Sequence, residues 1–198
     1  MPRSELLPLP GTPGLTLWSG LLGRAAADAM LARLLRQIPW RQPQVTLFGR
    51  TGPIPRLQSW HGDPDAEYSY SGLPLVPLPW TSELTLLRER VQIATGQPFN
   101  SVLVNLYRSG LDTMGWHADN ETVLGPAPWI ASYSLGASRD FTLRPRGSRR
   151  IDRSLPLGHD QLLLMPPPMQ ARWEHALPRR ARVSSPRINL TFRFIYPV

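Results

Sequence analysis

Two residues whose side chains bind metal ions stand two positions apart, His117 and Asp119, in the segment GWHADNE that follows a predicted strand. In an extended segment, residues i and i+2 point to the same face, so this imidazole and this carboxylate can converge on one ion. Of the other histidines, His175 is the best candidate for a third ligand. Two histidines and one carboxylate leave positions open on non-haem iron(II) for a co-substrate and oxygen. On its own, a His-x-Asp pair is more often two polar side chains that face water at the protein surface.

The last predicted strand alternates polar and apolar residues strictly, because Arg187, Asn189, Thr191 and Arg193 are separated by single apolar residues. The two arginines lie roughly 20 Å apart along such a strand, and each side chain reaches about 6 to 7 Å. If both fold inward, the remaining gap is on the order of 6 Å, about the length of a five-carbon dicarboxylate. Guanidinium groups suit both ends of that ligand. An ordinary strand with its polar side in water gives the same alternation.

Length and composition limit the architecture. A chain of 198 residues suits one domain, which we expect over residues 15–198. Residues 1–14 are rich in proline and glycine and are expected to form a flexible arm. The absence of cysteine leaves imidazole and oxygen groups as metal ligands. The sequence has neither an apolar run of about 20 residues nor a signal peptide, so we expect a cytoplasmic protein that does not enter a membrane.

The chain is strongly basic, with a net charge of +8 and an isoelectric point near 11.1. Such a charge favours a polyanionic partner, nucleic acid before membrane. All 22 basic residues are arginine, a bias that a GC-rich genome also explains. Several of them crowd residues 144–153, where a solvated basic loop is the alternative interpretation.

The predicted elements place helices first and strands after them. Apolar spacing predicts helices over residues 21–38 and 81–94, the second capped by Thr81 and closed by Gly96. Beyond Gly96, short β-type runs alternate with turn residues, at 101–107, 129–135, 140–144, 161–165 and 188–195. This order indicates an α+β domain with N-terminal helices and an antiparallel double-sheet roll, expected over residues 100–198.

The candidate metal ligands and the polar residues of the last predicted strand together resemble the AlkB family of iron(II) and 2-oxoglutarate dependent nucleic-acid demethylases. The similarity rests on an ordered set in the C-terminal half, namely Asn105-x-Tyr107, His117-x-Asp119, His175 and Arg187-x-Asn189-x-Thr191-x-Arg193. It implies a double-stranded β-helix (jelly roll). It also implies iron(II) on His117, Asp119 and His175 as the catalytic centre, with 2-oxoglutarate and O2 as co-substrates. The implied 2-oxoglutarate ligands are Asn105, Tyr107, Arg187, Asn189, Thr191 and Arg193.

By this resemblance, residues 45–80 are the nucleotide-recognition region, and residues 45–50 resemble the hairpin of the branch of this family that prefers duplex DNA. By this resemblance, Phe48 would wedge into the base stack while the damaged base is flipped out, although a buried strand phenylalanine is the alternative. Tyr70, Ser71 and Glu121 match base-pocket positions, and Arg56 matches a conformation- or backbone-contacting position.

The resemblance implies oxidative demethylation of bases such as 1-methyladenine and 3-methylcytosine in alkylated DNA, with release of formaldehyde, succinate and CO2. We expect a bacterial-type monomer that associates with the nucleoid when it acts. Three alternatives stay open: the same chemistry on RNA or protein, a non-catalytic nucleic-acid-binding module, and zinc hydrolysis on the same ligands. The sequence does not decide the preferred lesion, the strand preference, or the roles of residues 1–14 and 144–153.

Overall fold

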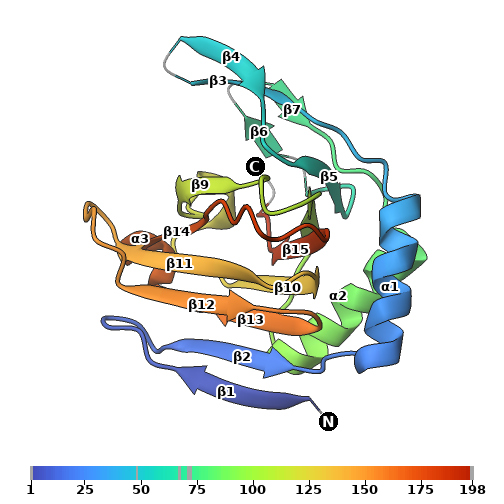
Figure 1. The fold of residues 1–198 in the computed structure, drawn as a ribbon, viewed down its shortest axis with the longest axis horizontal. Coiled ribbons are helices and arrows are strands. Elements are labelled where there is room, and N and C mark those ends of the chain that lie inside the picture. Colours follow the sequence, from blue (N-terminus) through green and yellow to red (C-terminus); the bar gives the residue numbers. More distant parts are fainter. Residues whose placement is uncertain (1, 48, 67, 71–72, 197–198) are drawn as a thin grey trace.

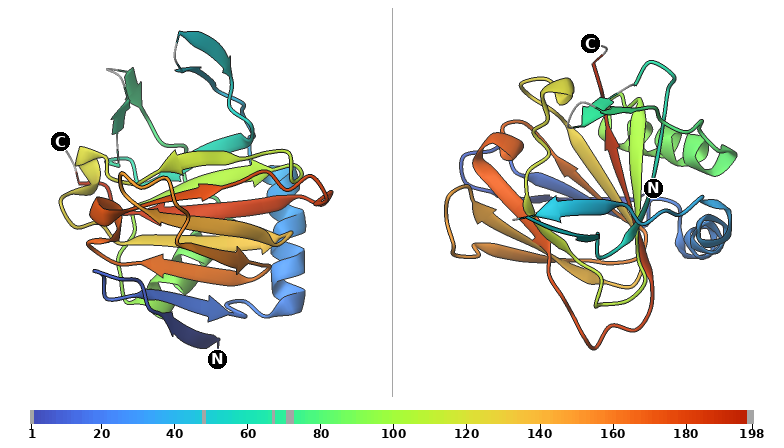
Figure 2. Two further views of the ribbon diagram at one scale, coloured as in Figure 1. Left: turned by 60° about the vertical axis from the view of Figure 1, so that its left-hand side comes forward. Right: turned by 90° about the horizontal axis from the view of Figure 1, so that it is seen from above.

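The computed structural model describes residues 2–47, 49–66, 68–70 and 73–196. Two antiparallel sheets face each other as the two walls of a roll (Figures 1 and 2). The 7-stranded sheet has the order β1 (Arg3–Leu7), β2 (Leu15–Ser19), β13 (Gln161–Met165), β10 (Ile130–Gly136), β15 (Arg187–Arg193), β8 (Ser101–Tyr107) and β5 (Leu57–Gly62). The 4-stranded sheet has the order β12 (Arg153–Leu157), β11 (Arg139–Pro145), β14 (Trp173–Leu177) and β9 (Met114–His117). The predicted α+β class with a jelly-roll core is therefore confirmed.

Two helices, α1 (Arg24–Gln37) and α2 (Ser82–Thr95), cover the outer face of the 7-stranded sheet, as the view from above in Figure 2 shows. The predicted cap of α2 is present, because Thr81 Oγ1 accepts a hydrogen bond from the backbone N–H of Leu84 at 3.3 Å. Gly96 ends the helix with a left-handed φ of 67°. A short helix, α3 (Met169–Arg172), directly precedes β14 of the 4-stranded sheet. A 3-10 turn, η1 (Thr122–Leu124), lies in the loop after β9. No described helix is long and apolar enough to cross a membrane.

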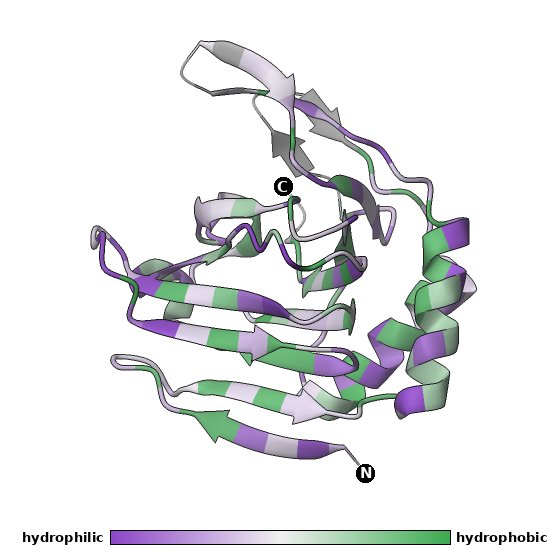
Figure 3. Cartoon of the chain, viewed as in Figure 1, coloured by the Kyte–Doolittle hydropathy of each residue, from purple (hydrophilic) through white to green (hydrophobic). Residues whose placement is uncertain are grey.

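Apolar residues form two clusters, one on each side of the 7-stranded sheet. In Figure 3 the strands carry alternating hydrophobic and hydrophilic bands, as expected where the two faces of a strand meet different surroundings. On β15, the residues Ile188, Leu190 and Phe192 are fully buried beneath the helices. The second cluster lies between the two sheets and includes Leu163 of β13 and Leu143 of β11. The polar face of β15 consequently points into the roll.

The N-terminal segment corrects one prediction. We expected residues 1–14 to form a flexible arm, but Arg3–Leu7 is strand β1, paired in register with β2 at the edge of the larger sheet. Most of β1 is exposed to solvent, so its order comes from backbone pairing rather than from the burial of its side chains. Leu9, just beyond β1, is 3% exposed and packs into the core between the sheets.

The limits of the predicted roll were too narrow. Residues 100–198 supply eight of its strands, but β1, β2 and β5 come from earlier in the chain. Residues 45–80 are divided between β5, which belongs to the larger sheet, and two hairpins at the top of Figure 1. The hairpins are β3 (Gln44–Leu47) with β4 (Arg50–Pro53), and β6 (Tyr68–Tyr70) with β7 (Leu73–Leu75).

Candidate metal and co-substrate site

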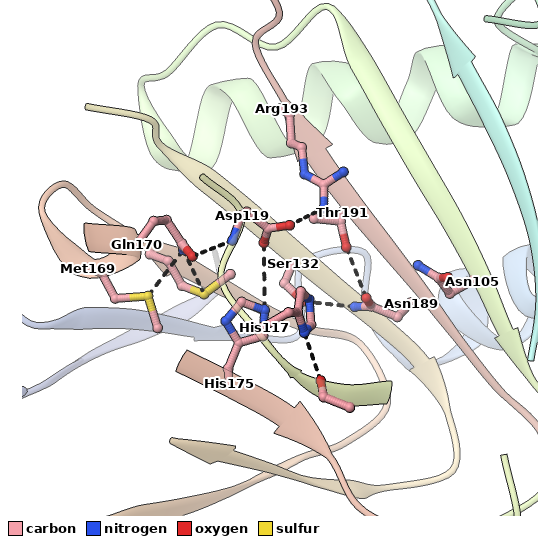
Figure 4. Close-up of polar contacts among 12 residues, drawn as sticks. Asn105, His117, Asp119, Ser132, Met169, Gln170, His175, Asn189, Thr191 and Arg193 are labelled. Atoms are coloured by element: carbon pink, nitrogen blue, oxygen red, sulfur yellow. Dashed lines mark hydrogen bonds and ion pairs between the residues drawn. The ribbon is translucent and has the colours of Figure 1, made fainter. Parts of the chain in front are cut away.

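Three potential metal ligands meet inside the roll (Figure 4). His117 ends β9, Asp119 follows two residues later, and His175 lies on β14 directly opposite His117. One ligand atom from each of the three side chains lies within 4.8 Å of the others. The His117 and His175 ring centroids are 4.2 Å apart, and His175 Nε2 lies 3.6 Å from Asp119 Oδ2. The i, i+2 spacing predicted from the sequence therefore does bring an imidazole and a carboxylate to one point.

The surroundings of Asp119 and His175 favour the protonation states that bind metal. Burial alone would raise the pKa of Asp119, but the charge of Arg193 and the two histidines outweigh it and hold this pKa below its ordinary value. Burial, followed by the charge of His117, lowers the pKa of His175 to about 3. His117 Nδ1 lies 2.9 Å from the carbonyl oxygen of Gly115, which fixes the proton on Nδ1 and leaves the Nε2 lone pair available. Two imidazoles and one carboxylate fit iron(II).

Gln170 of α3 is a site residue that the sequence did not reveal. Its Oε1 accepts a hydrogen bond from the backbone N–H of Asp119 at 2.9 Å, and the residue is 2% exposed. Its Nε2 donates to the sulfur atoms of Met169 at 3.1 Å and Met165 at 3.6 Å (Figure 4). No spacing or periodicity marks a lone glutamine in such a short helix, so no sequence signal could have identified it.

The predicted 2-oxoglutarate residues line the same cavity as the metal ligands. Their strands β8 and β15 are neighbours, with Arg187 opposite Tyr107 and Asn189 opposite Asn105. The cavity is lined by Asn105, Tyr107, His117, Asp119, His175, Arg187, Asn189, Thr191 and Arg193, together with apolar residues and Ser132. Because this polar face points into the roll, the alternative of an ordinary surface strand is wrong.

The two arginines of β15 lie at different ends of this cavity. Arg193 Nη2 donates to Asp119 Oδ1, so it marks the metal end. Arg187 Nη2 donates to Ser134 Oγ at 2.9 Å, and its Cζ lies 5.5 Å from the ring centroid of Tyr107. Burial, partly offset by Tyr107, lowers the pKa of Arg187 to about 10, so it remains a cation at neutral pH.

A chain of hydrogen bonds joins the middle of the cavity. Thr191 Oγ1 donates to Asn189 Oδ1 at 3.1 Å, and Asn189 Nδ2 donates to Ser132 Oγ at 2.8 Å (Figure 4). Ser132 lies on β10, next to β15, and was not predicted as a site residue. These bonds fix the Asn189 amide, so the polar wall is ordered by the protein itself.

Of the five predicted substrate-contacting residues, the structure describes the side chains of two, Arg56 and Glu121. Arg56 is half-buried, and its Nε donates to Asn105 Oδ1 at 3.0 Å, so it touches a predicted co-substrate residue. Glu121 immediately precedes η1 and is not among the residues that line the cavity. Tyr70 lies on β6, and only its backbone is described. Phe48 and Ser71 lie outside the described residues.

Comparison with known proteins decides the family. A model of the 2OG-Fe(II) oxygenase superfamily matches residues 14–193. The DNA oxidative demethylase ALKBH2 of Mus musculus is 44% identical over 187 residues, which cover 89% of this chain and 78% of that protein. The alpha-ketoglutarate-dependent dioxygenase alkB homolog 3 of Homo sapiens is 37% identical over 196 residues, covering 94% of this chain and 68% of that protein. The chain belongs to the AlkB family.

A solved structure shows the same fold for this AlkB-family protein. The structure titled "The structure of OsALKBH1" has a TM-score of 0.69, covering 96% of this chain and 100% of that chain at 17% identity. Family membership makes the protein a dioxygenase that uses iron(II), 2-oxoglutarate and O2. The paired arginines and the buried triad accord with this chemistry. Zinc hydrolysis on the same ligands leaves the arginines without a role, and a non-catalytic module leaves the triad without one.

Proposed function

We propose that this protein repairs DNA by oxidative demethylation of N-alkylated bases such as 1-methyladenine and 3-methylcytosine. One observation carries the proposal: the three metal ligands and the six oxoglutarate-type residues line one cavity inside the roll. Relatives named as DNA oxidative demethylases, 44% and 42% identical to this chain, support DNA as the substrate.

Each set of residues has a separate task in this reaction. His117, Asp119 and His175 would hold iron(II), which when bound couples the oxidation of an N-methyl group by O2 to the decarboxylation of 2-oxoglutarate. Arg187 and Tyr107 would bind the carboxylate of 2-oxoglutarate that is remote from the metal, because they face each other at the end of the β15–β8 pairing opposite to Arg193, which bonds to Asp119. Arg193 would orient the end nearest the metal. The hydroxymethyl group formed on the base then leaves as formaldehyde.

The protein's own contribution is to position the reactants and to exclude water. Asp119 and His175 are 2% and 5% exposed, so the metal end of the cavity is shielded from bulk solvent. Asn105, held by Arg56, and Asn189, held by Ser132 and Thr191, present ordered polar groups to the co-substrate. Preorganised dipoles in a desolvated cavity need little rearrangement during the reaction.

The direct test is mass spectrometry of a 1-methyladenine oligonucleotide after anaerobic loading with iron(II) and exposure to air, with and without 2-oxoglutarate. We expect loss of the mass of one methylene group only when 2-oxoglutarate is present. His117→Ala should abolish this loss, whereas His159→Ala, a histidine outside the cavity, should retain it. An untouched base with continued conversion of 2-oxoglutarate to succinate would contradict DNA demethylation and leave the dioxygenase chemistry intact.

The strand preference belongs to the same proposal. We infer that Phe48 serves as a wedge in duplex DNA, an assignment supported by the resemblance of residues 45–50 to the duplex-preferring branch. Phe48→Ala should then lower activity on a double-stranded oligonucleotide and spare the single-stranded one. Equal activity ratios in the wild type and the variant would contradict the wedge and favour single-stranded DNA or RNA as the substrate.

The protein is further proposed to act as a monomer. Size-exclusion chromatography with light scattering should give a mass near 22.3 kDa. A mass twice as large would contradict this.

A further inference from the structure

Arg139, the first residue of β11, carries a deeply buried cation. The residue is 2% exposed. Its Nη1 donates to the carbonyl oxygen of Ser109 at 3.0 Å, and its Nη2 donates to the carbonyl oxygens of Asp112 at 2.9 Å and Pro178 at 2.7 Å. All three acceptors are neutral, and Nε has no hydrogen-bond partner within the described residues. Burying a charge in this way is costly, which suggests that the charge has a use.

The three carbonyl groups belong to two loops of the site. Ser109 and Asp112 lie between β8 and β9, and Pro178 begins the connection from β14 to β15. In each case the loop joins a strand with a proposed metal ligand, His117 on β9 or His175 on β14, to a strand with predicted co-substrate residues, β8 or β15. The two loops also bond to each other, because the backbone N–H of Gly110 donates to the carbonyl oxygen of Val183 at 2.7 Å. Arg139 therefore fixes the spacing between the two halves of the site.

The charge of Arg139 lies close to the cavity. Its Cζ is 5.8 Å from the ring centroid of Tyr107, and the Cζ of Arg187 is 5.5 Å from the same centroid. The nearby carboxylate of Asp112 already accepts three hydrogen bonds from Arg108, at 2.8 to 2.9 Å. Two buried guanidinium groups thus adjoin one aromatic ring, and the carboxylate beside them is already paired. A bound anion would relieve this excess of positive charge.

We propose that Arg139 is a positioning residue for 2-oxoglutarate. It holds Tyr107 and Arg187 around the carboxylate that is remote from the metal, and its charge strengthens the binding of that carboxylate. The inference rests on the proposed assignment of Tyr107 and Arg187 to this carboxylate. It adds a residue of the 4-stranded sheet to a carboxylate site built mainly from β8 and β15 of the 7-stranded sheet.

The test compares two ligands of the Mn(II)-loaded protein by isothermal titration calorimetry. N-oxalylglycine carries both the metal-chelating group and the remote carboxylate, whereas oxalate carries only the chelating group. Arg139→Met removes the cation at nearly constant volume, and Arg139→Lys restores a positive charge. Arg180→Met is the matched control, since it removes a neighbouring arginine whose side chain is 42% exposed and pairs with Asp140.

We expect Arg139→Met to weaken N-oxalylglycine binding by at least about tenfold, while oxalate affinity changes by less than about twofold. Arg139→Lys should recover part of the loss, and Arg180→Met should show none. If the binding of N-oxalylglycine and the binding of oxalate weaken equally, Arg139 has only a general structural role and the proposal is overturned. Unchanged binding of both ligands would overturn it as well. If Arg139→Met does not fold, Arg139→Gln is judged by the same criterion. A wild-type protein that binds oxalate but not N-oxalylglycine would overturn the co-substrate assignment itself, and this inference with it.

Discussion

At the scale of single residues, Asp119 is fixed before any metal binds. Gln170 holds its backbone N–H, Arg193 bonds to one carboxylate oxygen, and His175 lies 3.6 Å from the other. The carboxylate therefore cannot rotate freely toward other partners. Such groups behind a metal ligand commonly raise metal affinity because they reduce the cost of ordering the ligand.

Gln170→Ala should weaken metal binding. The substitution removes the acceptor for the Asp119 N–H and leaves that group unpaired in a buried place, so the loop after β9 loses its anchor. We expect the dissociation constant for iron(II), measured by anaerobic titration, to rise about tenfold or more. Gln42→Ala, in which an exposed glutamine loses a bond to a backbone carbonyl, is the control. Equal metal affinity in the two variants would contradict the anchoring role.

Asp112 makes stability depend on pH. Burial alone would raise the pKa of Asp112, but the hydrogen bonds and charge of Arg108 outweigh it, so this pKa lies below its ordinary value of 3.8. A depressed carboxyl pKa stabilises the folded state above the unfolded pKa, and the contribution is lost as pH falls through the folded pKa. Asp112→Asn should therefore lower the free energy of unfolding at pH 7 by about 1 kcal/mol or more. Thermal melts should show this difference shrinking below about pH 4, and a difference that stays constant as the pH falls from 7 to about 2 would contradict it.

The sequence could predict residues whose spacing matches the geometry of a strand, and only those. His117 with Asp119, and Arg187 with Arg193, sit at even separations, which place side chains on one face. Gln170, Ser132 and Arg139 have no such spacing, and a single arginine among 22 looks like surface charge. Their burial depends on contacts between distant segments.

At the scale of elements, a helix could be predicted from neighbouring residues, whereas the short strands depend on pairing with distant segments. The cap at Thr81 and the glycine at Gly96 predicted both ends of α2 to within about one residue. The short strands β9 and β14 carry the proposed metal ligands His117 and His175, but their apolar residues do not alternate cleanly, and neither was predicted as a strand. They exist because each is paired with a neighbouring strand of the smaller sheet.

Deleting residues 2–8 should cost stability but leave the chemistry intact. The deletion removes β1, which pairs only with β2 among the described strands and is separated by three strands from β15 and its proposed co-substrate residues. We expect a fall of about 1 to 2 kcal/mol in the free energy of unfolding by urea, because the lost contacts are mainly backbone hydrogen bonds of an edge strand. Succinate formation per active site at 20 °C should stay within about twofold of wild type. A loss of turnover without a loss of stability would show that β1 serves the site directly.

At the scale of the whole molecule, we expect the arginines to contribute unequally to DNA binding. The net charge of +8 attracts DNA from any direction, but only arginines that contact phosphates release counterions on binding. Arg149 and Arg150 are exposed in the connection between β11 and β12. This connection lies at the left of Figure 1, on the side away from α1. Location, rather than total charge, should therefore decide the salt dependence of binding.

The salt dependence of binding to an unmodified DNA duplex tests this distinction. If Arg149 and Arg150 each neutralise one phosphate, the double alanine variant should reduce the slope of log K against log salt by about 2, because each contact contributes about 0.9. Arg24→Ala with Arg36→Ala removes the same charge from exposed positions on α1, and its slope should equal that of the wild type. Fluorescence anisotropy between 50 and 200 mM salt, about the range over which such contacts lose most affinity, measures all three proteins. Equal slopes for the two double variants would mean that DNA responds to net charge alone, and residues 144–153 would then be a solvated basic loop.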